Sequence, residues 1–351
     1  MVSIDTSVAK PAFLRRWHNL TELRLFFAFS VVLSHTIQLA GYNSLYVLRV
    51  VFSSKTAVDA FFILSGFLVV ASYERCKDNL DFYRRRFLRI YPAYVVAVLF
   101  FLSLGIVQAM AKGFAVSAIE VLKYLAANLA LANFLKPTVD GVFATNQVHE
   151  INGALWTIKV EASFYVIVPL VCYFARRTSY HVAAATLMLI GLGWVAFLGL
   201  LHDYAGVSIH ESLYYQLPGE MQYFGLGVLL YAVHRAHHTE RLAGFMLLAI
   251  AAFAALIGQA WTGAEMIVLS ALIYFVIHLP RLKTALADFD ISYGVYLSHF
   301  PIIQLLLSAA DWQNLSFVLL PLVGLLTALW AVISWYTVEQ PSIGMAKRLA
   351  V

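Results

Sequence analysis

The dominant feature of the sequence is a series of long, nearly charge-free apolar runs, most of them close to the length that crosses a bilayer. A transmembrane α-helix needs about 20 predominantly apolar residues. Backbone polar groups in hydrocarbon must be hydrogen-bonded within their own segment, so such runs are helices. Only 12% of the residues are charged, against about 25% in soluble domains. We therefore expect an all-α integral membrane protein.

Hydropathy predicts eleven apolar segments, and the basic residues beside them give their orientation. The segments are 23–41, 57–74, 88–110, 115–135, 154–175, 180–201, 218–234, 242–260, 263–280, 291–310 and 315–337. Lys and Arg are enriched in cytoplasmic loops, so the basic residues before the first segment place the N-terminus inside. Inside positions are marked by Lys10, Arg15 and Arg16, the basic residues 75–89, Arg176–Arg177, Arg235 with Arg241, Arg281 with Lys283, and Lys347–Arg348.

These marks require that one segment does not cross. The third segment must end outside, and the fifth must start outside to deliver Arg176–Arg177 to the inside, so 115–135 cannot span. We predict ten transmembrane helices plus one re-entrant or interfacial helix at 115–135, in a single membrane-embedded domain over 1–351. Residues 1–22 and 338–351 are predicted to be short cytoplasmic termini at the cytoplasmic (inner) membrane.

Composition also excludes several classes of protein. The net charge of +5 comes from basic residues at the ends of apolar runs, which indicates topology rather than a nucleic-acid interface. The two cysteines suggest neither a disulfide framework nor a metal site. Two polar outer segments, 136–153 and 202–211, are the natural places for an extracytoplasmic acceptor, although they can equally be ordinary connecting loops.

Two ionisable residues share the first predicted span. A charged side chain inside a span costs about 2.5–3.5 kcal/mol and usually faces a protein-lined cavity. Arg24 and His35 are eleven residues apart, so they lie on one helical face about 16 Å apart along the axis. Two polar positions on one stripe suit an elongated ligand. The alternative is an arginine that sets topology and a buried structural histidine.

Two acidic residues in other spans are further candidates. Asp59 should lie at a depth similar to that of His35, and we hypothesise that it accepts a proton from one imidazole nitrogen and leaves the other as general base. A structural carboxylate near a helix N-terminus is the rival interpretation. Glu161 is predicted to pair with Arg24 or His35, or to contact the acceptor, and a purely structural ion pair remains open.

A cluster of arginines opens the third segment on the predicted cytoplasmic side. Arg85 and Arg89 share a helical face, as do Arg86 and Arg89. With Arg84 they form a group of planar guanidiniums that suits phosphate. Topology alone, or contact with lipid headgroups, is the alternative explanation.

Six sequence motifs follow one another along the chain. They are LRLFFAFSVVLSH (Leu23–His35), AVDAFFILSGFL (Ala57–Leu68), FYRRRFLRIYP (Phe82–Pro92), NGALWTIKVEASFY (Asn152–Tyr165), SYGVYLSH (Ser292–His299) and VEQP (Val338–Pro341). In this order they resemble the motifs of the acyltransferase-3 family of membrane-bound sugar O-acyltransferases. Ala57 stands where the family usually has Gly, and Thr157 where it has Ser.

The resemblance implies a ten-helix core, acyl-CoA (usually acetyl-CoA) as the donor, and an extracytoplasmic carbohydrate as the acceptor. It also implies that His35 and Arg24 carry catalysis and that the basic cluster lies near CoA. We expect this chain to be the membrane core without the esterase-like domain that the family often carries. Membrane lipid is an expected partner, and neither a metal nor nucleic acid is expected.

In the predicted mechanism His35 is the general base, and Tyr296, Ser65 or Arg24 stabilises the oxyanion. A covalent acyl-histidine intermediate is an open alternative. The other motif residues are assigned to substrate binding or to structure: Trp156, Tyr165, His299 and Glu339. Acylation of a small glycosylated metabolite or a glycolipid is an alternative within the enzyme class. A secondary transporter is the rival outside it, although the sequence has no repeated halves. A protein that passively binds a lipid or partner would not need so many intramembrane polar groups.

Overall fold

The structure is a computed structural model that describes residues 19–205, 207–235, 240–280, 282 and 289–348. Over these ranges the chain is helical and contains no strand. The basic residues used to orient the chain lie partly outside the described residues, namely Lys10, Arg15, Arg16, Arg281 and Lys283.

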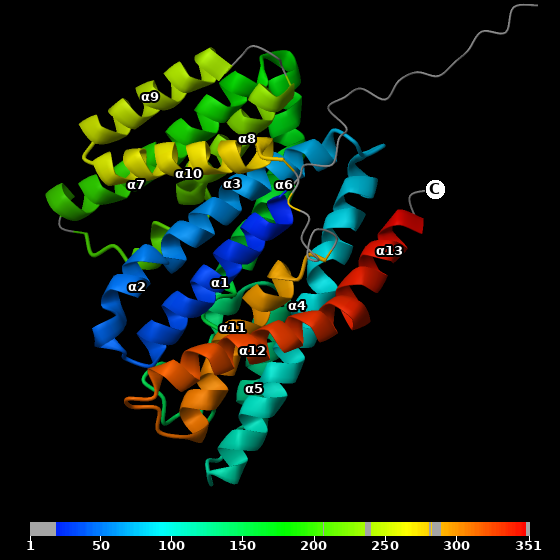
Figure 1. Ribbon diagram of the computed structural model, residues 1–351, viewed down its shortest axis with the longest axis vertical. Helices are drawn as coiled ribbons and strands as arrows, with labels where there is room; N and C mark the ends of the chain where they lie inside the picture. Colours follow the sequence, from blue (N-terminus) through cyan, green and yellow to red (C-terminus); the bar gives the residue numbers. More distant parts are fainter. Residues whose placement is uncertain (1–18, 206, 236–239, 281, 283–288, 349–351) are drawn as a thin grey trace, which may run out of the picture.

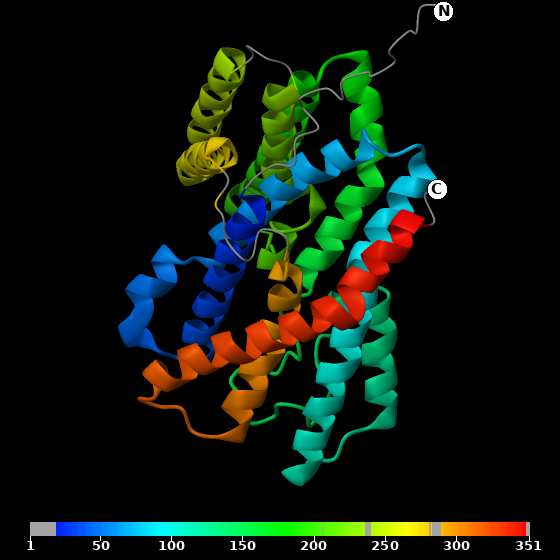
Figure 2. The same cartoon turned by 45° about the vertical axis from the view of Figure 1, so that its right-hand side comes forward.

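All eleven predicted segments are helices. They are α1 (Leu20–Leu39), α3 (Ser54–Tyr73), α4 (Asn79–Ala111), α5 (Ala118–Leu129), α6 (Trp156–Arg177), α7 (Tyr180–Ala205), α8 (Leu217–Arg235), α9 (Glu240–Leu256), α10 (Ala260–His278), α11 (Ser292–Ala309) and α12 (Ser316–Ser334). The short helix α2 (Tyr46–Val51) precedes α3, and α13 (Gln340–Arg348) continues α12 through a π-helical turn at Trp335–Glu339. In Figure 2 α12 and α13 follow each other diagonally across the molecule.

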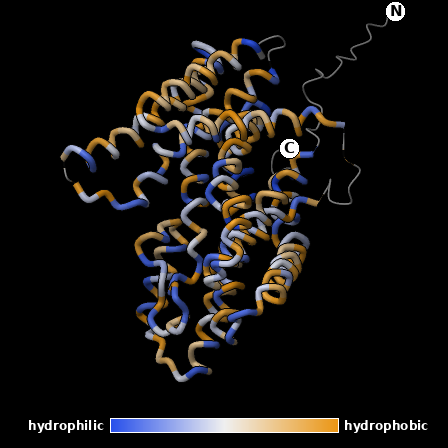
Figure 3. The backbone as a smooth tube through the Cα atoms, turned by 60° about the vertical axis from the view of Figure 1, so that its left-hand side comes forward, coloured by the Kyte–Doolittle hydropathy of each residue, from blue (hydrophilic) through white to orange (hydrophobic). Residues whose placement is uncertain are grey.

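Seven of the described helical segments are long and apolar enough to cross a membrane. This confirms a membrane protein built from helices, and the count of ten spans stays a prediction. Figure 3 shows the apolar stretches along the helices and the hydrophilic residues mostly at their ends and in the loops. Helix α5 has 12 residues, fewer than the roughly 20 that a span requires, as expected for a helix that does not cross.

Helix α5 packs along α4 through tyrosines. The hydroxyl of Tyr91 donates to the Leu129 carbonyl at 3.0 Å, and that of Tyr94 donates to the Asn128 carbonyl at 2.8 Å. Both carbonyls lie at the C-terminal end of α5, where helical carbonyls have no partner within the helix. These bonds fasten the end of the short helix to the long one.

Helices α1, α3 and α11 occupy the centre of the molecule (Figure 1), and α3 approaches α8 very closely. A Cβ on Gly66 would lie 2.2 Å from the Phe224 carbonyl oxygen, and one on Gly227 would lie 2.0 Å from the Ile63 carbonyl oxygen. Small residues allow helix backbones in membranes to come this close. The contact fixes α3, whose opposite face lines the site described next.

Candidate active site

A cavity of about 510 Å³ lies between α1, α3, α4, α6, α11 and α13. Most of the α3 residues that line it recur at helical spacing and form one face of the helix: Val58, Phe61, Phe62, Ser65, Leu68, Val69 and Ser72, with Leu64 beside them. Residues 58 and 72 are about 21 Å apart along a helix that rises 1.5 Å per residue. The cavity is therefore elongated.

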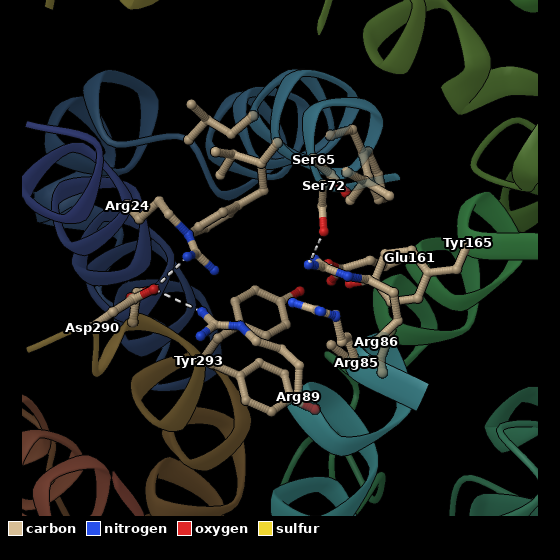
Figure 4. Close-up of a pocket in the computed structure, with 18 of the residues that line it drawn as sticks. Arg24, Ser65, Ser72, Arg85, Arg86, Arg89, Glu161, Tyr165, Asp290 and Tyr293 are labelled. Carbon is tan, nitrogen blue, oxygen red and sulfur yellow. Dashed lines mark hydrogen bonds and ion pairs between the residues drawn. The ribbon is translucent and has the colours of Figure 1, made fainter. Parts of the chain in front are cut away.

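One end of the cavity is strongly basic. Five arginines are among its described lining residues, against the two carboxylates of Glu161 and Asp290. Figure 4 shows the guanidinium groups of α1 and α4 directed into the cavity, opposite Ser65 and Ser72 of α3. The five are Arg24, Arg75, Arg85, Arg86 and Arg89.

Arg86 is held by one hydrogen bond and two aromatic rings. One of its Nη atoms donates to the Ser72 hydroxyl at 2.7 Å, and its guanidinium lies 5.9 Å and 5.7 Å from the ring centres of Phe82 and Tyr165. Rings within about 6 Å attract a cation through their electron-rich faces. Arg86 is thus fixed in orientation before any ligand binds.

Arg24 and Arg89 share the carboxylate of Asp290. Arg89 donates to Oδ2 of Asp290 at 2.7 Å, and Arg24 contacts the same oxygen (Figure 4). Burial alone would raise the pKa of Asp290, but the two guanidinium groups outweigh it and hold this pKa below its usual range. Asp290 was not among the residues predicted from the sequence. Its position two residues before the SYGVYLSH motif was the available signal.

Two donors in the cavity wall have no hydrogen-bond partner among the described residues: Oγ of Ser65 and Nε of Arg86. Ser65 is 9% exposed. Buried polar groups in native proteins are nearly always paired. Unpaired donors in the wall of a basic cavity are what a site for an anionic, oxygen-rich ligand would present.

The other end of the cavity is uncharged and aromatic. Phe61, Thr157 and Tyr296 line it, and the rings of Phe61 and Tyr296 are 6.0 Å apart in an edge-to-face arrangement. Oγ1 of Thr157 and the Tyr296 hydroxyl are hydrogen-bonded at 2.8 Å. This end therefore carries a pair of hydroxyl groups in an otherwise apolar wall.

A pair of histidines lies directly behind Tyr296. Nδ1 of His35 is 2.9 Å from Nε2 of His299, and Nδ1 of His299 is 2.7 Å from the carbonyl oxygen of Tyr296. The rings of Tyr296 and His299 are 5.5 Å apart. Neither histidine is among the lining residues that the structure describes for the cavity.

Next to this pair, helix α11 lacks one of its backbone hydrogen bonds, and a side chain from another segment replaces it. Pro301 has no N–H to donate to the Leu297 carbonyl, and Nδ2 of Asn152 donates to that carbonyl instead, at 2.9 Å. His299 is fully buried. The NGALW motif and the SYGVYLSH motif, far apart in the sequence, are thus fastened together at the site.

Two predicted site residues lie elsewhere. Asp59 was predicted to orient His35, but its carboxylate bonds to Lys55 Nζ at 2.6 Å, one turn earlier on the same helix. A buried carboxylate takes the nearest ammonium as its partner. Arg84 was predicted to contact phosphate, but it is not a described lining residue. Arg84 and Arg85 both pair with Asp81, at 3.2 Å and 2.9 Å, and of the two only Arg85 lies in the described cavity wall.

The remaining predicted residues have partners close by. Glu161 lines the cavity and accepts a hydrogen bond from the Tyr165 hydroxyl at 2.6 Å, rather than pairing with Arg24 or His35. Trp156 packs its ring 5.8 Å from that of Tyr215.

Glu339 is 2% exposed, lies in the π-helical turn and accepts from the Ser334 hydroxyl at 2.9 Å. A Cβ on Gly294 would come within 3.1 Å of its carboxylate. Glu339 therefore joins α11 to the end of α12.

Comparison with known proteins identifies the class. A family model described as an acyltransferase domain matches residues 17–336. The chain belongs to this family, the acyltransferase-3 family.

The curated relatives include three named proteins. Nodulation protein 10 of Rhizobium leguminosarum bv. viciae is 28% identical, over 95% of this chain and 96% of the relative. An O-acetyl transferase of Shigella phage Sf6 is 26% identical, over 90% and 93%. The O-acetyltransferase OatA of Staphylococcus aureus is 24% identical, and its match covers 81% of this chain but only 52% of OatA. No solved structure matches the chain.

Proposed function

We propose that this protein moves an acyl group, most simply acetyl, from cytoplasmic acyl-CoA to a hydroxyl of a carbohydrate on the other side of the membrane. The observation that carries the proposal is the elongated cavity, which has an arginine-rich end and a neutral end that borders the histidine pair. Family membership and the two relatives named as O-acetyltransferases support the class of reaction.

Acyl-CoA suits both the charge and the shape of the cavity. Its phosphates would lie at Arg85, Arg86 and Arg89, because planar guanidinium groups bind phosphate through paired hydrogen bonds. Its pantetheine arm would follow the α3 face past Ser65, whose unpaired hydroxyl can donate to an amide carbonyl. A cavity of about 510 Å³ is within the usual range of about 300–1,000 Å³ for ligand sites.

The thioester would then reach the neutral end of the cavity, next to His35. Nε2 of His35 takes the proton from the acceptor hydroxyl as its oxygen attacks the thioester carbonyl carbon. The tetrahedral oxyanion collapses, the carbon–sulfur bond breaks, and the CoA thiolate recovers the proton from His35. General-base catalysis of this kind typically contributes about 10²–10⁴-fold.

Among the three oxyanion donors predicted from the sequence, Tyr296 has the most suitable position. Arg24 is bonded to Asp290 at the basic end of the cavity, about 16 Å along α1 from His35. The Tyr296 hydroxyl lies at the neutral end with Thr157. Because Phe61 and Tyr296 line the cavity and His35 is not among its described lining residues, we infer that one of these two rings moves when the thioester engages the base.

The test is acyl transfer from radiolabelled acetyl-CoA by the purified protein in liposomes, with and without carbohydrate acceptors. The wild type is compared with His35→Ala, and with His278→Ala as control. His278 is exposed and contacts the carbonyl of Tyr274 in its own helix at 2.8 Å. CoA binding is measured in parallel by calorimetry.

We expect label transfer by the wild type and the control, and CoA binding without transfer by His35→Ala. If no variant binds acyl-CoA, the donor assignment fails. If His35→Ala transfers label at the wild-type rate, the enzyme class stands but His35 is not its base.

A further inference from the structure

We propose that His299 is a positioning residue that fixes the proton of His35 on Nδ1 and so leaves Nε2 as the free base. The inference rests on the proposed function for the role of His35. The hydrogen bonds of the two imidazoles and the burial of His299 support it.

The first step is the protonation of His299. A carbonyl oxygen can only accept, so Nδ1 of His299, 2.7 Å from the Tyr296 carbonyl, must carry a proton. His299 is fully buried, and an unpaired charge is costly to bury. The ring is therefore neutral, and its Nε2 has a lone pair.

The second step is the protonation of His35. Nε2 of His299 is an acceptor, so Nδ1 of His35, 2.9 Å away, must be the donor. In a neutral imidazole, the nitrogen opposite the donor carries the lone pair. When His35 is neutral, its Nε2 is therefore unprotonated, which is the state that a general base requires. A free histidine side chain prefers the opposite tautomer, so the contact with His299 determines which one is present.

The arrangement of the rings supports a directed hydrogen bond. The ring centres are 5.1 Å apart and the planes are inclined by only 12°. The distance between the two bonded nitrogens, 2.9 Å, is shorter than the distance between the ring centres by about two ring radii. The two rings therefore meet edge to edge, and the N–H of His35 points at the lone pair of His299. Phe300 lies edge-on to His35, with ring centres 5.8 Å apart and planes at 82°, and it restricts rotation of the imidazole.

The arrangement performs the task of the carboxylate in a Ser-His-Asp triad, which holds the histidine in its working tautomer. Here the orienting group is a neutral imidazole anchored to a main-chain carbonyl. Asp59, the carboxylate that sequence reasoning placed in this role, is bonded to Lys55.

The first readout is the tautomer itself, independent of turnover. ¹⁵N shifts of the His35 imidazole, assigned by its loss in His35→Ala, distinguish a protonated from an unprotonated Nε2 in labelled protein in nanodiscs. Three variants are compared with the wild type. His299→Gln keeps an acceptor oxygen near the position of Nε2, and His299→Leu removes it. Ser298→Ala is the matched control, since Ser298 is equally buried and its hydroxyl bonds to carbonyls of its own helix, at 2.9 Å and 3.5 Å.

We expect a proton on Nδ1 of His35 in the wild type, in His299→Gln and in Ser298→Ala, and a shift of that proton to Nε2 in His299→Leu. Acyl transfer should remain within about tenfold of wild type in His299→Gln and fall by at least about 100-fold in His299→Leu, the lower range of a general-base contribution. A wild-type His35 protonated on Nε2 overturns the proposal even if His299→Leu does not fold. An unchanged tautomer in folded His299→Leu also overturns it. Absence of transfer by the wild type with the expected tautomer would refute the proposed function alone.

Discussion

Two arginines two residues apart on α4 offer a direct test of the donor site. Arg86 lines the cavity, and Arg84 pairs with Asp81 outside it. Arg86→Gln should weaken the binding of CoA, and Arg84→Gln should not. Both substitutions remove one positive charge from the same turn, so a general electrostatic effect would appear equally in both.

The magnitude follows from the contacts of Arg86. Its bond to Ser72 leaves Nε buried and without a described partner, so the group has hydrogen-bonding capacity left for a phosphate. A hydrogen bond to a charged group contributes about 1.5–3 kcal/mol, which corresponds to a rise in Kd of about 10- to 150-fold. Arg86→Lys should fall between wild type and Arg86→Gln, because lysine keeps the charge but loses the planar fork and the stacking on the rings.

Isothermal titration calorimetry of CoA into purified protein in detergent gives the dissociation constants of the wild type and of the three variants. Size-exclusion chromatography and thermal unfolding establish that the variants are folded. Equal weakening by Arg84→Gln and Arg86→Gln would mean that charge, not the cavity, governs binding. An unchanged Kd in a folded Arg86→Gln protein would show that the phosphates of CoA do not bind at this end of the cavity.

Three further substitutions test the fold and the site. Asp290→Asn should lower thermal stability by about 1.5–3 kcal/mol at pH 7. Because the native pKa of Asp290 is depressed, its contribution is complete above the unfolded value of about 3.9 and disappears as the pH falls through the lower native pKa. Melting curves of both proteins at several pH values should therefore converge in acid; a constant difference would contradict the ion pair. Gly227→Ala places a Cβ 2.0 Å from the Ile63 carbonyl oxygen and should destabilise by about 1–3 kcal/mol, and an unchanged melting temperature would mean that α3 and α8 can separate freely. Asp59→Asn should lower the melting temperature through the loss of the Lys55 pair, while the tautomer of His35 stays as in the wild type; a changed tautomer would restore Asp59 to the catalytic group.

The helices could be predicted from the sequence because hydropathy and positive charge act locally. Segment 115–135 shows this best: the charge marks excluded it as a span, and the structure gives it a helix of only 12 residues. The spacing of the arginines was also informative. Arg85 and Arg86 are four and three residues from Arg89, and all three line the cavity. Arg84 is five residues from Arg89 and is not among the described lining residues.

Contacts between helices could not be predicted from hydropathy, charge and helical spacing. Depth in the membrane placed Asp59 near the level of His35, but equal depth does not specify which faces meet. The actual partner of His35 is 264 residues away, and Asp290 joins Arg24 of α1 to Arg89 of α4 across three separate segments. Such pairings depend on the rotation and tilt of packed helices, which side-chain packing sets.

The spacing of Arg24 and His35 along one helix affects how the helices together form the cavity. The sequence placed them on one face of the first span, about 16 Å apart, and favoured an elongated ligand. In the structure Arg24 belongs to the basic end of the cavity, whereas His35 lies behind Tyr296 at its neutral end. One helix therefore sets the distance between the basic end of the cavity and His35, the proposed base. A thioester is separated from the nucleotide of its CoA by a pantetheine arm of fixed length, so this distance, rather than the chemistry of either residue alone, would determine which end of the donor meets the base.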